Sequence, residues 1–285
     1  VQNQAHYYAH KKKIDPYKDI FFAQVDDQVV AYASVFWEQE HEGPLVYFHA
    51  GHVLPEWRRK GLGTALFQHT EDRLREIASG HDAAKEKVFH GWLANTETGT
   101  RKLFEQRGYE EIRYFYLMIR DLNQPIPEVQ LPDGLEVVPV KEEHFRKIFD
   151  ASNEAFRDHW GHVEQTEEAF ERWVKDPVRD ESIWKVAWDG DEVAGMVLNY
   201  VFPEENQKLG VNWGWTDPIC VRRPWRRRGL ARALILESLH LLKQNGFDHA
   251  ALGVDTKNPS GALTLYKSAG YEVREEWTDY RRKMD

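Results

Sequence analysis

The chain contains the same ten-residue motif twice, and this repeat constrains its fold more than any other feature. WRRKGLGTAL at Trp57–Leu66 returns as WRRRGLARAL at Trp225–Leu234, so that Gly61 recurs as Gly229, 168 positions later. Each copy follows a β-branched apolar stretch and opens an amphipathic one, which predicts a strand, a basic turn and a helix. The spacing is that of one domain, so it predicts two similar domains. Consecutive backbone N–H groups at a helix N-terminus can bind an anion, and the two turns therefore indicate two phosphate-binding domains.

Composition narrows the class of protein. The 285 residues, 41% hydrophobic and 30% charged, are ordinary for a globular protein of two medium-sized domains. The net charge of −9 argues against general affinity for nucleic acid and mildly favours a cationic or amine substrate. No apolar stretch is long enough to span a bilayer, so no membrane partner is expected. Cys220 is the only cysteine, which excludes an intrachain disulfide and predicts a cytoplasmic protein.

Hydrophobic periodicity predicts the elements of the first copy. Strands are expected at 20–24, 29–37, 45–54, 87–93 and 109–120, and helices at 61–78 and 98–107. The last of these strands is expected to close the first domain. Pro125, Pro127 and Pro132 mark a linker, so we expect an N-terminal domain over 1–122 and a linker over 123–134.

The second copy repeats this topology in a C-terminal domain over 135–285. Strands are expected at 135–140, 182–188, 192–201, 211–221, 249–254 and 271–283, and helices at 142–156, 166–174, 260–269 and from the second basic turn to 244. The first copy has only residues 1–19 in place of the leading strand and two helices. The N-terminal domain is therefore predicted to be incomplete at its start.

The two basic turns are followed by further matching residues. Arg58-x-x-Gly61-x-Gly63 and Arg226-x-x-Gly229-x-Ala231 both fit the pattern Q/R-x-x-G-x-G/A, and neither carries the G-K-S/T of a Walker loop. One strand later the second copy has Asn258, Tyr266 and Gly270-Tyr271. In the matching places the first copy has Asn95, Phe104 and Gly108-Tyr109.

With both parts in view, the chain resembles the GNAT acetyltransferase superfamily as a tandem of two domains, similar in form to mycothiol synthase-like proteins. The resemblance covers nearly all of the second half and most of the first, and it is most specific across Ile219–Tyr271. It implies a mixed α/β fold in each domain, with a central splayed sheet flanked by helices. It also implies acetyl-CoA as co-substrate and no metal.

The resemblance also implies where acetyl-CoA would bind. Its pyrophosphate is expected on the backbone amides of 226–231, because Gly229 and Ala231 leave room for close approach. A backbone N–H near Ile219–Val221 is expected to hold the oxyanion of the thioester carbonyl. The predicted cofactor-binding residues are Ile219, Cys220, Val221, Arg226, Arg227, Arg228, Gly229, Leu230, Ala231 and Asn258. In the first copy they are Arg58, Arg59, Lys60, Gly61, Leu62 and Gly63, which form either a working site or a retained, empty turn.

Tyr266 matches the family position for the acid that protonates the leaving thiolate. A phenol of pKa about 10 against a thiol of about 8.5 makes this a hydrogen-bonded, stabilising donation. The first copy has Phe104 there, and a phenyl ring donates no proton. The N-terminal domain is therefore predicted to be degenerate and the C-terminal one catalytic.

The acceptor is expected under the loop Arg157–Gln165. Strand alternation predicts one face for Asp217, Ile219 and Val221, which aims Asp217 near the reacting centre. Asp217, His159 or Glu154 is the expected base or water relay. Three of the candidate residues have a plain alternative: Asp217 as a strand-end residue, His159 as a surface residue of the loop, and Tyr266 as a core tyrosine.

The sequence therefore predicts an N-acetyltransferase that acetylates a small-molecule amine by direct attack in a ternary complex. Three alternatives stay open: a mycothiol-synthase-like acceptor, a peptide acetyltransferase, and a CoA-binding sensor or scaffold without turnover. No nucleic acid or membrane partner is expected, and either a monomer or a homodimer is compatible with the sequence.

Overall fold

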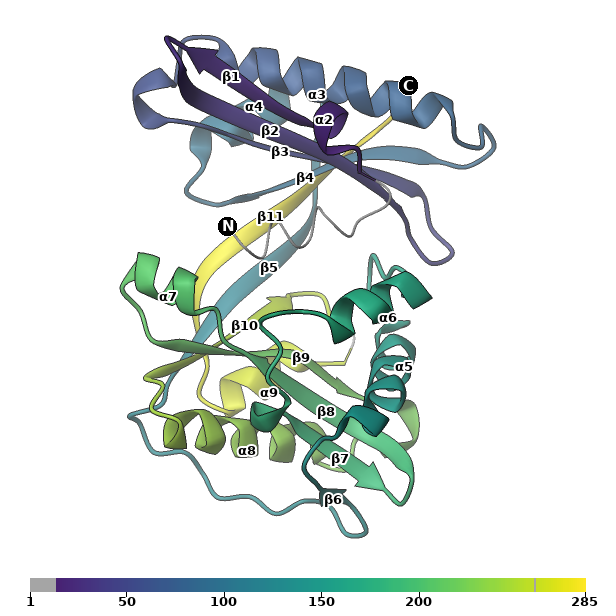
Figure 1. The fold of residues 1–285 in the computed structure, drawn as a ribbon, viewed down its shortest axis with the longest axis vertical. Coiled ribbons are helices and arrows are strands. Elements are labelled where there is room, and N and C mark those ends of the chain that lie inside the picture. Colours follow the sequence, from purple (N-terminus) through teal and green to yellow (C-terminus); the bar gives the residue numbers. More distant parts are fainter. Residues whose placement is uncertain (1–13, 259) are drawn as a thin grey trace. The chain divides into compact units, whose positions relative to one another are not determined.

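The computed structural model of the chain describes residues 14–258 and 260–285, which fold into two compact units. The first unit contains the described residues up to Tyr114 together with Trp277–Asp285, and the second contains Phe115–Glu276. Each unit is a β-sheet with helices packed on it (Figure 1). Within these ranges, no helix combines the length and the apolar character that crossing a bilayer requires.

The sheet of the first unit has the strand order β1-β2-β3-β4-β11. Its elements are α2 (Pro16–Asp19), β1 (Ile20–Val25), β2 (Gln28–Gln39), β3 (Leu45–Val53), α3 (Leu62–Ser79), β4 (Lys87–Ala94), α4 (Thr98–Gln106) and part of β11 (Glu272–Lys283). All neighbours are antiparallel except β3 and β4, which are parallel. Helices α3 and α4 cover one face, where Phe67 and Phe104 pack with Tyr47 and Phe89.

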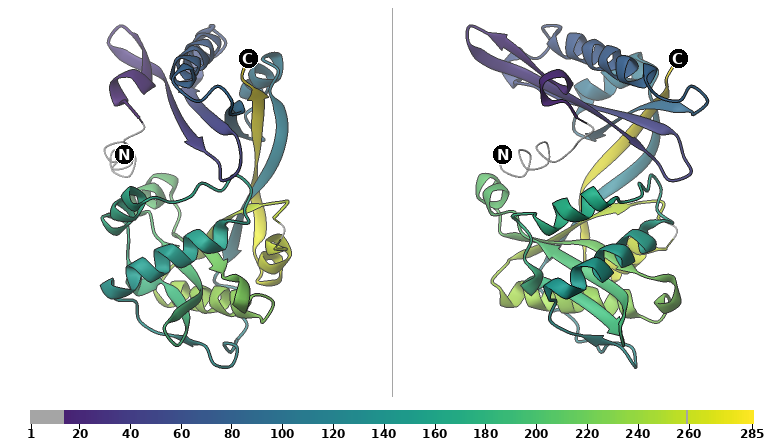
Figure 2. Two further views of the ribbon diagram at one scale, coloured as in Figure 1. Left: turned by 90° about the vertical axis from the view of Figure 1, so that its right-hand side faces the viewer. Right: turned by 45° about the vertical axis from the view of Figure 1, so that its right-hand side comes forward.

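The sheet of the second unit has the order β5-β10-β9-β8-β7-β6. Its elements are part of β5 (Glu110–Asp121), β6 (Glu136–Val137), α5 (Phe145–Phe156), α6 (Glu167–Val174), β7 (Lys185–Asp189), β8 (Glu192–Tyr200), α7 (Pro203–Leu209), β9 (Trp213–Val221), α8 (Leu230–Gln244), β10 (His249–Asp255) and α9 (Ala262–Ser268). Helices α5 and α6 lie on one face, and α8 and α9 on the other (Figure 2).

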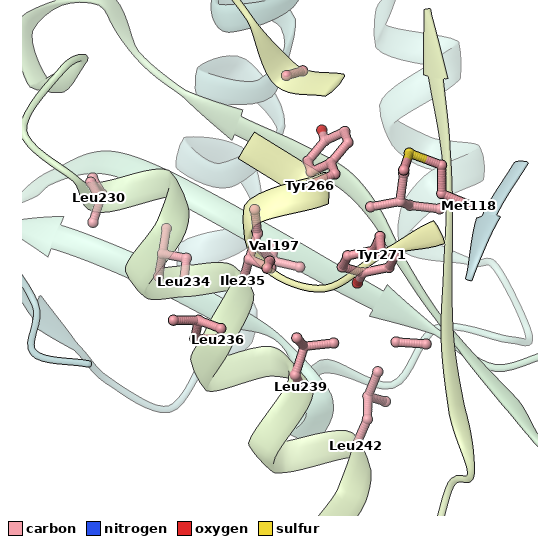
Figure 3. Packing of buried hydrophobic residues seen from close by; sticks show 14 of the residues in the cluster. Met118, Val197, Leu230, Leu234, Ile235, Leu236, Leu239, Leu242, Tyr266 and Tyr271 are labelled. Carbon is pink, nitrogen blue, oxygen red and sulfur yellow. The ribbon is translucent and has the colours of Figure 1, made fainter. Parts of the chain in front are cut away.

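The central strands of the second unit are buried on both faces, which explains their nearly continuous apolar sequences. Along β8, Val197 packs with α8 in one cluster, whereas Met196 and Leu198 pack with α5 in another. We call these the α8 cluster and the α5 cluster. Figure 3 shows the α8 cluster, in which the leucines of the helix lie beside Tyr266 and Tyr271.

The closing strand of each sequence repeat lies in the other unit. Phe115–Asp121 of β5 pairs with β10 in the second unit, and Trp277–Lys283 of β11 pairs with β4 in the first. The compact units therefore differ from the predicted domains 1–122 and 135–285. The predicted linker also packs, because Ile126, Val129 and Leu131 contact the α8 cluster. An alternating strand fits either of two similar sheets, so periodicity alone does not define its partner.

The other elements agree closely with those predicted, with three differences. The predicted strand at 135–140 is only the short β6, and the predicted strand at 182–188 begins with a 3₁₀ turn at Glu181–Ile183. Helix α7 was not predicted, although Pro203 at its first position and Gly210 at its end are the usual signals. The described residues before β1 form only α2, and residues 1–13, on which the predicted incomplete start also depends, lie outside the described ranges.

Candidate active site

The two basic turns have the same backbone conformation. Arg227 and Gly229 have φ angles of 61° and 85°, and so do Arg59 and Gly61. Each glycine precedes a helix whose first backbone N–H groups donate no hydrogen bond to a capping side chain. Uncapped N–H groups at the positive end of a helix dipole attract phosphate. Both turns therefore retain the backbone geometry of an anion site.

Three arginines around the second turn bind carboxylates of the protein itself. Arg222 Nε donates to Glu154 at 2.7 Å. Arg223 and Arg226 both donate to Asp158, at 2.5 and 2.8 Å, and hold the pKa of that carboxyl below its usual range. The side chain of Arg226 therefore connects the turn to Asp158 and to the carbonyl of Ala155 in α5, while its backbone N–H donates to the carbonyl of Arg223 at 3.3 Å.

The side chains of the next two arginines, Arg227 and Arg228, do not bind these carboxylates. Arg227 is exposed and has no hydrogen-bond or ion-pair partner within the described ranges. Arg228 donates to the carbonyl of Asp133 at 3.3 Å. A side chain added at Gly229 would meet nothing within 4 Å, so the turn is open to solvent at this point. The predicted residues 227–231 are thus brought together around the N-terminus of α8.

The strands beside the second turn separate. β9 pairs with β10 only over Trp213–Trp215, although it stays paired with β8 as far as Val221. The first unit repeats this feature, because β3 pairs with β4 only over Leu45–Phe48. A gap of this kind is what the family resemblance predicts for the pantetheine arm.

A β-bulge lies in β9 where the separation begins. Asp217 and Pro218 together face the single residue Leu198 of β8, which belongs to the α5 cluster. Beyond the bulge, Ile219 and Val221 pack with the α8 cluster. The predicted common face of Asp217, Ile219 and Val221 is therefore wrong, because the extra residue reverses the alternation.

The backbone amides beyond the bulge alternate in direction. The N–H of Arg222 donates to the carbonyl of Ala194 in β8 at 3.0 Å. Because alternate residues of an antiparallel strand point their amides in opposite directions, the N–H groups of Val221 and Ile219 point away from β8. They point to the side from which β10 has parted, where an oxyanion needs its donors.

Tyr266 lies on α9 at the edge of the same gap. It is 8% exposed, and its hydroxyl has no hydrogen-bond partner among the described residues. Figure 3 shows this hydroxyl pointing away from the α8 leucines. Burial raises the pKa of Tyr266, and Asp217 and Cys220 raise it further. The hydroxyl therefore keeps its proton at neutral pH and is free to donate it.

Asp217 is an exposed residue of β9, but the protein around its carboxyl group removes part of that group's hydration. Desolvation raises its pKa to about 6. It forms no hydrogen bond or ion pair with the described part of the chain. An accessible carboxylate whose pKa lies near neutrality is suited to general-base catalysis.

A buried hydrogen-bond relay fixes the point at which the strands part, and sequence reasoning missed it. Thr216 Oγ1 donates to the carbonyl of Ala251 at 3.2 Å, so Tyr271 is the donor in their 2.6 Å hydroxyl contact. The N–H of Tyr271 in turn donates to the carbonyl of Tyr266. The relay thereby connects the backbone beside Asp217 to α9. The tyrosine after the glycine that follows α9 was the available signal.

The other two predicted bases have different surroundings. Glu154 is held in its ion pair with Arg222, which leaves Asp217 as the freer carboxylate. His159 is half-buried in the loop after α5, and burial lowers its pKa while Asp255 at the end of β10 opposes that shift. Its imidazole is therefore neutral and lies within electrostatic reach of the gap.

Asn258 lies in the turn between β10 and α9. Its Oδ1 accepts hydrogen bonds from the backbone N–H and the hydroxyl of Ser260, at 2.9 and 2.6 Å. It therefore shapes the turn that leads into α9, and its contact with pantetheine stays a prediction. No group of three or more His, Cys, Asp or Glu side chains suited to a metal occurs in the described ranges.

The equivalent positions of the first unit are closed. The unbulged β2–β3 pair puts Ala50, which has no titratable group, in the place of the Asp217–Pro218 bulge. His49 stands in the place of Thr216, and it contacts Thr70 Oγ1 at 2.9 Å and the Tyr109 hydroxyl at 3.0 Å. Burial lowers the pKa of His49 to about 3. Phe104 packs on Tyr109 and covers Gly91, where an added Cβ would lie 2.4 Å from the phenyl ring. The first unit thus has no free acid or base at these two positions.

Comparison with known proteins matches both halves of the chain. Residues 145–271 match the acetyltransferase (GNAT) family, and residues 16–111 match an acetyltransferase (GNAT) domain. The mycothiol acetyltransferase of Geodermatophilus obscurus is 27% identical over 233 residues, which cover 81% of this chain and 72% of that relative.

Solved structures agree. A GCN5-related N-acetyltransferase from Sphaerobacter thermophilus is similar with a TM-score of 0.74 and 28% identity, over 95% of this chain and 82% of its own. A tandem GNAT protein from the clavulanic acid biosynthesis pathway shares the fold, with a TM-score of 0.66 and 15% identity over 93% and 82%. With two basic turns, two splayed sheets and a GNAT match to each half, the chain belongs to the GNAT acetyltransferases, as a tandem N-acetyltransferase that depends on acetyl-CoA.

Proposed function

We propose that the second unit transfers the acetyl group of acetyl-CoA to the amine of a small molecule, by direct attack while both are bound. The observation that carries this proposal is the pair formed by Asp217 and Tyr266. Both side chains are unpartnered in the described part of the chain, interact electrostatically and lie where the strands part. Because a fold does not define its substrate, a mycothiol-like acceptor, a peptide amine and a sensor without turnover are the alternatives.

The residues of the second turn fit the pyrophosphate of acetyl-CoA. The backbone amides of 227–231 would hold it at the start of α8, and the free side chain of Arg227 would add charge. When bound, acetyl-CoA supplies the acetyl group as a thioester. The N–H groups of Ile219 and Val221 would stabilise negative charge on its carbonyl oxygen.

Asp217 and Tyr266 then act as the proton acceptor and the proton donor of the reaction. Asp217 accepts one from the ammonium group of the acceptor, which frees the nitrogen lone pair for attack. As the N–C bond forms and the C–S bond breaks, Tyr266 donates its proton to the departing sulfur. The proton lost by the acylated nitrogen restores the Tyr266 hydroxyl, and Asp217 releases its own to solvent. The products are an amide, a free thiol and one proton.

Cys220 favours direct attack over an acetyl-enzyme. It is 7% exposed and packs in the α5 cluster, and burial raises the pKa of its thiol to about 12. A thiol that stays protonated is a poor nucleophile. We propose that the first unit binds acetyl-CoA or serves as scaffold without transferring, because Ala50 and Phe104 stand where the second unit has Asp217 and Tyr266.

Gly229→Glu is expected to abolish binding of acetyl-CoA to the second unit. The glycine has a φ of 85°, which is strained for any other residue, and a carboxylate there repels phosphate. Calorimetric titration of acetyl-CoA into the full chain measures the effect, with Gly61→Glu in the equivalent turn as the matched control. One site that only Gly229→Glu removes supports the proposal. Binding that neither variant weakens contradicts it.

The pH dependence of kcat/KM tests the base. Asp217 must be ionised to accept a proton, so kcat/KM is expected to rise with pH up to about 6 and to level off above it. Asp217→Asn should remove that acidic limb and lower the plateau by about 100-fold. Asp217→Glu is the conservative control and should restore part of the activity. An Asn variant with an unchanged profile would assign the limb to another group, such as His159.

A further inference from the structure

Five aromatic side chains form a continuous row in the second unit. Trp184 stacks on Trp173 with ring centres 5.4 Å apart, and the indole N–H of Trp173 donates to the Tyr200 hydroxyl at 3.0 Å. The Tyr200 and Phe202 rings are nearly parallel, with centres 6.4 Å apart. Phe202 then meets Trp215 edge to face, again at 6.4 Å. The row thus runs from the hydrophobic interior to β9.

The two ends of this row differ in their surroundings. Trp184 is buried, and Trp173 and Tyr200 pack against the α5 cluster, so the core accounts for them. Phe202 and Trp215 are half-buried and belong to none of the hydrophobic clusters of the described residues. Two large aromatic rings that are half-exposed and lie outside the hydrophobic clusters form a surface suited to contact with a ligand.

The free end of the row lies beside Asp217. Tyr200 faces Trp215 across the β8–β9 pair, on the same side of the sheet as Leu198, which faces Asp217. Burial raises the pKa of the Tyr200 hydroxyl, and Asp217 is close enough to add to that rise. One side of the sheet therefore presents a solvent-accessible carboxylate next to two half-exposed rings.

We infer that the acceptor is a primary amine attached through a short chain to a flat apolar ring. Its ammonium group binds Asp217, and its ring packs on Trp215 and Phe202. This inference rests on the proposed acetyl transfer and narrows the acceptor class. A linear alkylamine or polyamine satisfies the carboxylate but leaves the aromatic surface without a matching flat partner.

Ring-on-ring packing distinguishes such an acceptor from an amine of similar hydrophobicity. An aromatic pair contributes about 0.5–1.5 kcal/mol beyond its buried area, which is up to about tenfold in kcat/KM. The carboxylate contributes equally to both amines, because each carries one ammonium group. The preference for the ring therefore reports on the aromatic row alone.

The test compares 2-phenylethylamine with n-hexylamine as acceptors for the full chain at saturating acetyl-CoA. We expect kcat/KM to be about tenfold higher for 2-phenylethylamine. Trp215→Leu keeps an apolar side chain without an aromatic face and should reduce this preference to less than about threefold. Trp92→Leu is the matched control in β4 of the first unit, where the side chain is 39% exposed, and it should keep the full preference.

The outcomes separate this inference from the proposed function. Equal kcat/KM for the two amines, or a preference that survives Trp215→Leu, overturns the aromatic acceptor class while acetyl transfer stands. Failure to acetylate either amine also overturns the class. In that case, loss of acetyl-CoA binding in Gly229→Glu still supports the transferase, and absence of binding to the unmodified chain removes both.

Discussion

Tyr266→Phe is expected to lower kcat by about 10³-fold while leaving the affinity for acetyl-CoA unchanged. The phenyl ring still fills its place in the α8 cluster, so the fold of α9 should not change. What disappears is a hydroxyl that burial keeps protonated and that no described residue engages. The departing thiolate then has no acid to protonate it, so kcat falls while the affinity for acetyl-CoA does not change.

Steady-state kinetics and calorimetry on the same preparations test this prediction. Tyr47→Phe is the control, because Tyr47 is fully buried in the first unit and bonds His81 through its hydroxyl at 2.6 Å. It removes a buried phenol that belongs to the first unit and is not one of the proposed site residues, so it should keep kcat. An unchanged kcat in Tyr266→Phe would favour a sensor or another acid, and weaker acetyl-CoA binding would give the tyrosine a structural role.

The repeat made much of the fold predictable, because its signals are local. A basic stretch, a glycine and an amphipathic run lie next to one another in the sequence, and they place the start of α3 at Leu62 and of α8 at Leu230. The partner of a closing strand depends instead on contacts far away along the chain. Nothing in the alternation of β5 or β11 says which of two similar sheets it joins.

The candidate site also combines features that matching positions in the sequence predict with features that only the folded structure reveals. The family resemblance identified Tyr266, and aligning the two copies contrasted it with Phe104, because the residues match position by position. The β-bulge at Asp217 escaped notice, since one extra residue against Leu198 leaves no periodic mark. The ion pair between Glu154 and Arg222 joins residues 68 positions apart in the sequence. The sequence shows the two opposite charges but not that they form a pair.

Deleting Trp277–Asp285 is expected to unfold the first unit, although these residues end the second sequence repeat. Tyr280 is fully buried in the first unit and donates to Glu111 at 2.6 Å. Arg282 pairs with the buried Glu71 at 3.0 Å. Loss of a buried aromatic side chain costs about 3–5 kcal/mol, against about 5–15 kcal/mol for a whole domain. Removing the strand also leaves the edge of β4 without its partner.

Hydrogen exchange of backbone amides locates the damage. Amides of β4 should lose protection in the deletion, whereas those of β10, paired with β5 and β9, should keep it. Tyr280→Ala in the full chain is a milder variant and should weaken protection of β4 in the same direction. Tyr17→Ala, at a side chain that is 96% exposed, is the control. Loss of protection in β10 with β4 intact would mean that each repeat closes its own sheet. In that case β11 would stabilise the second unit, which contains β10, and not the first.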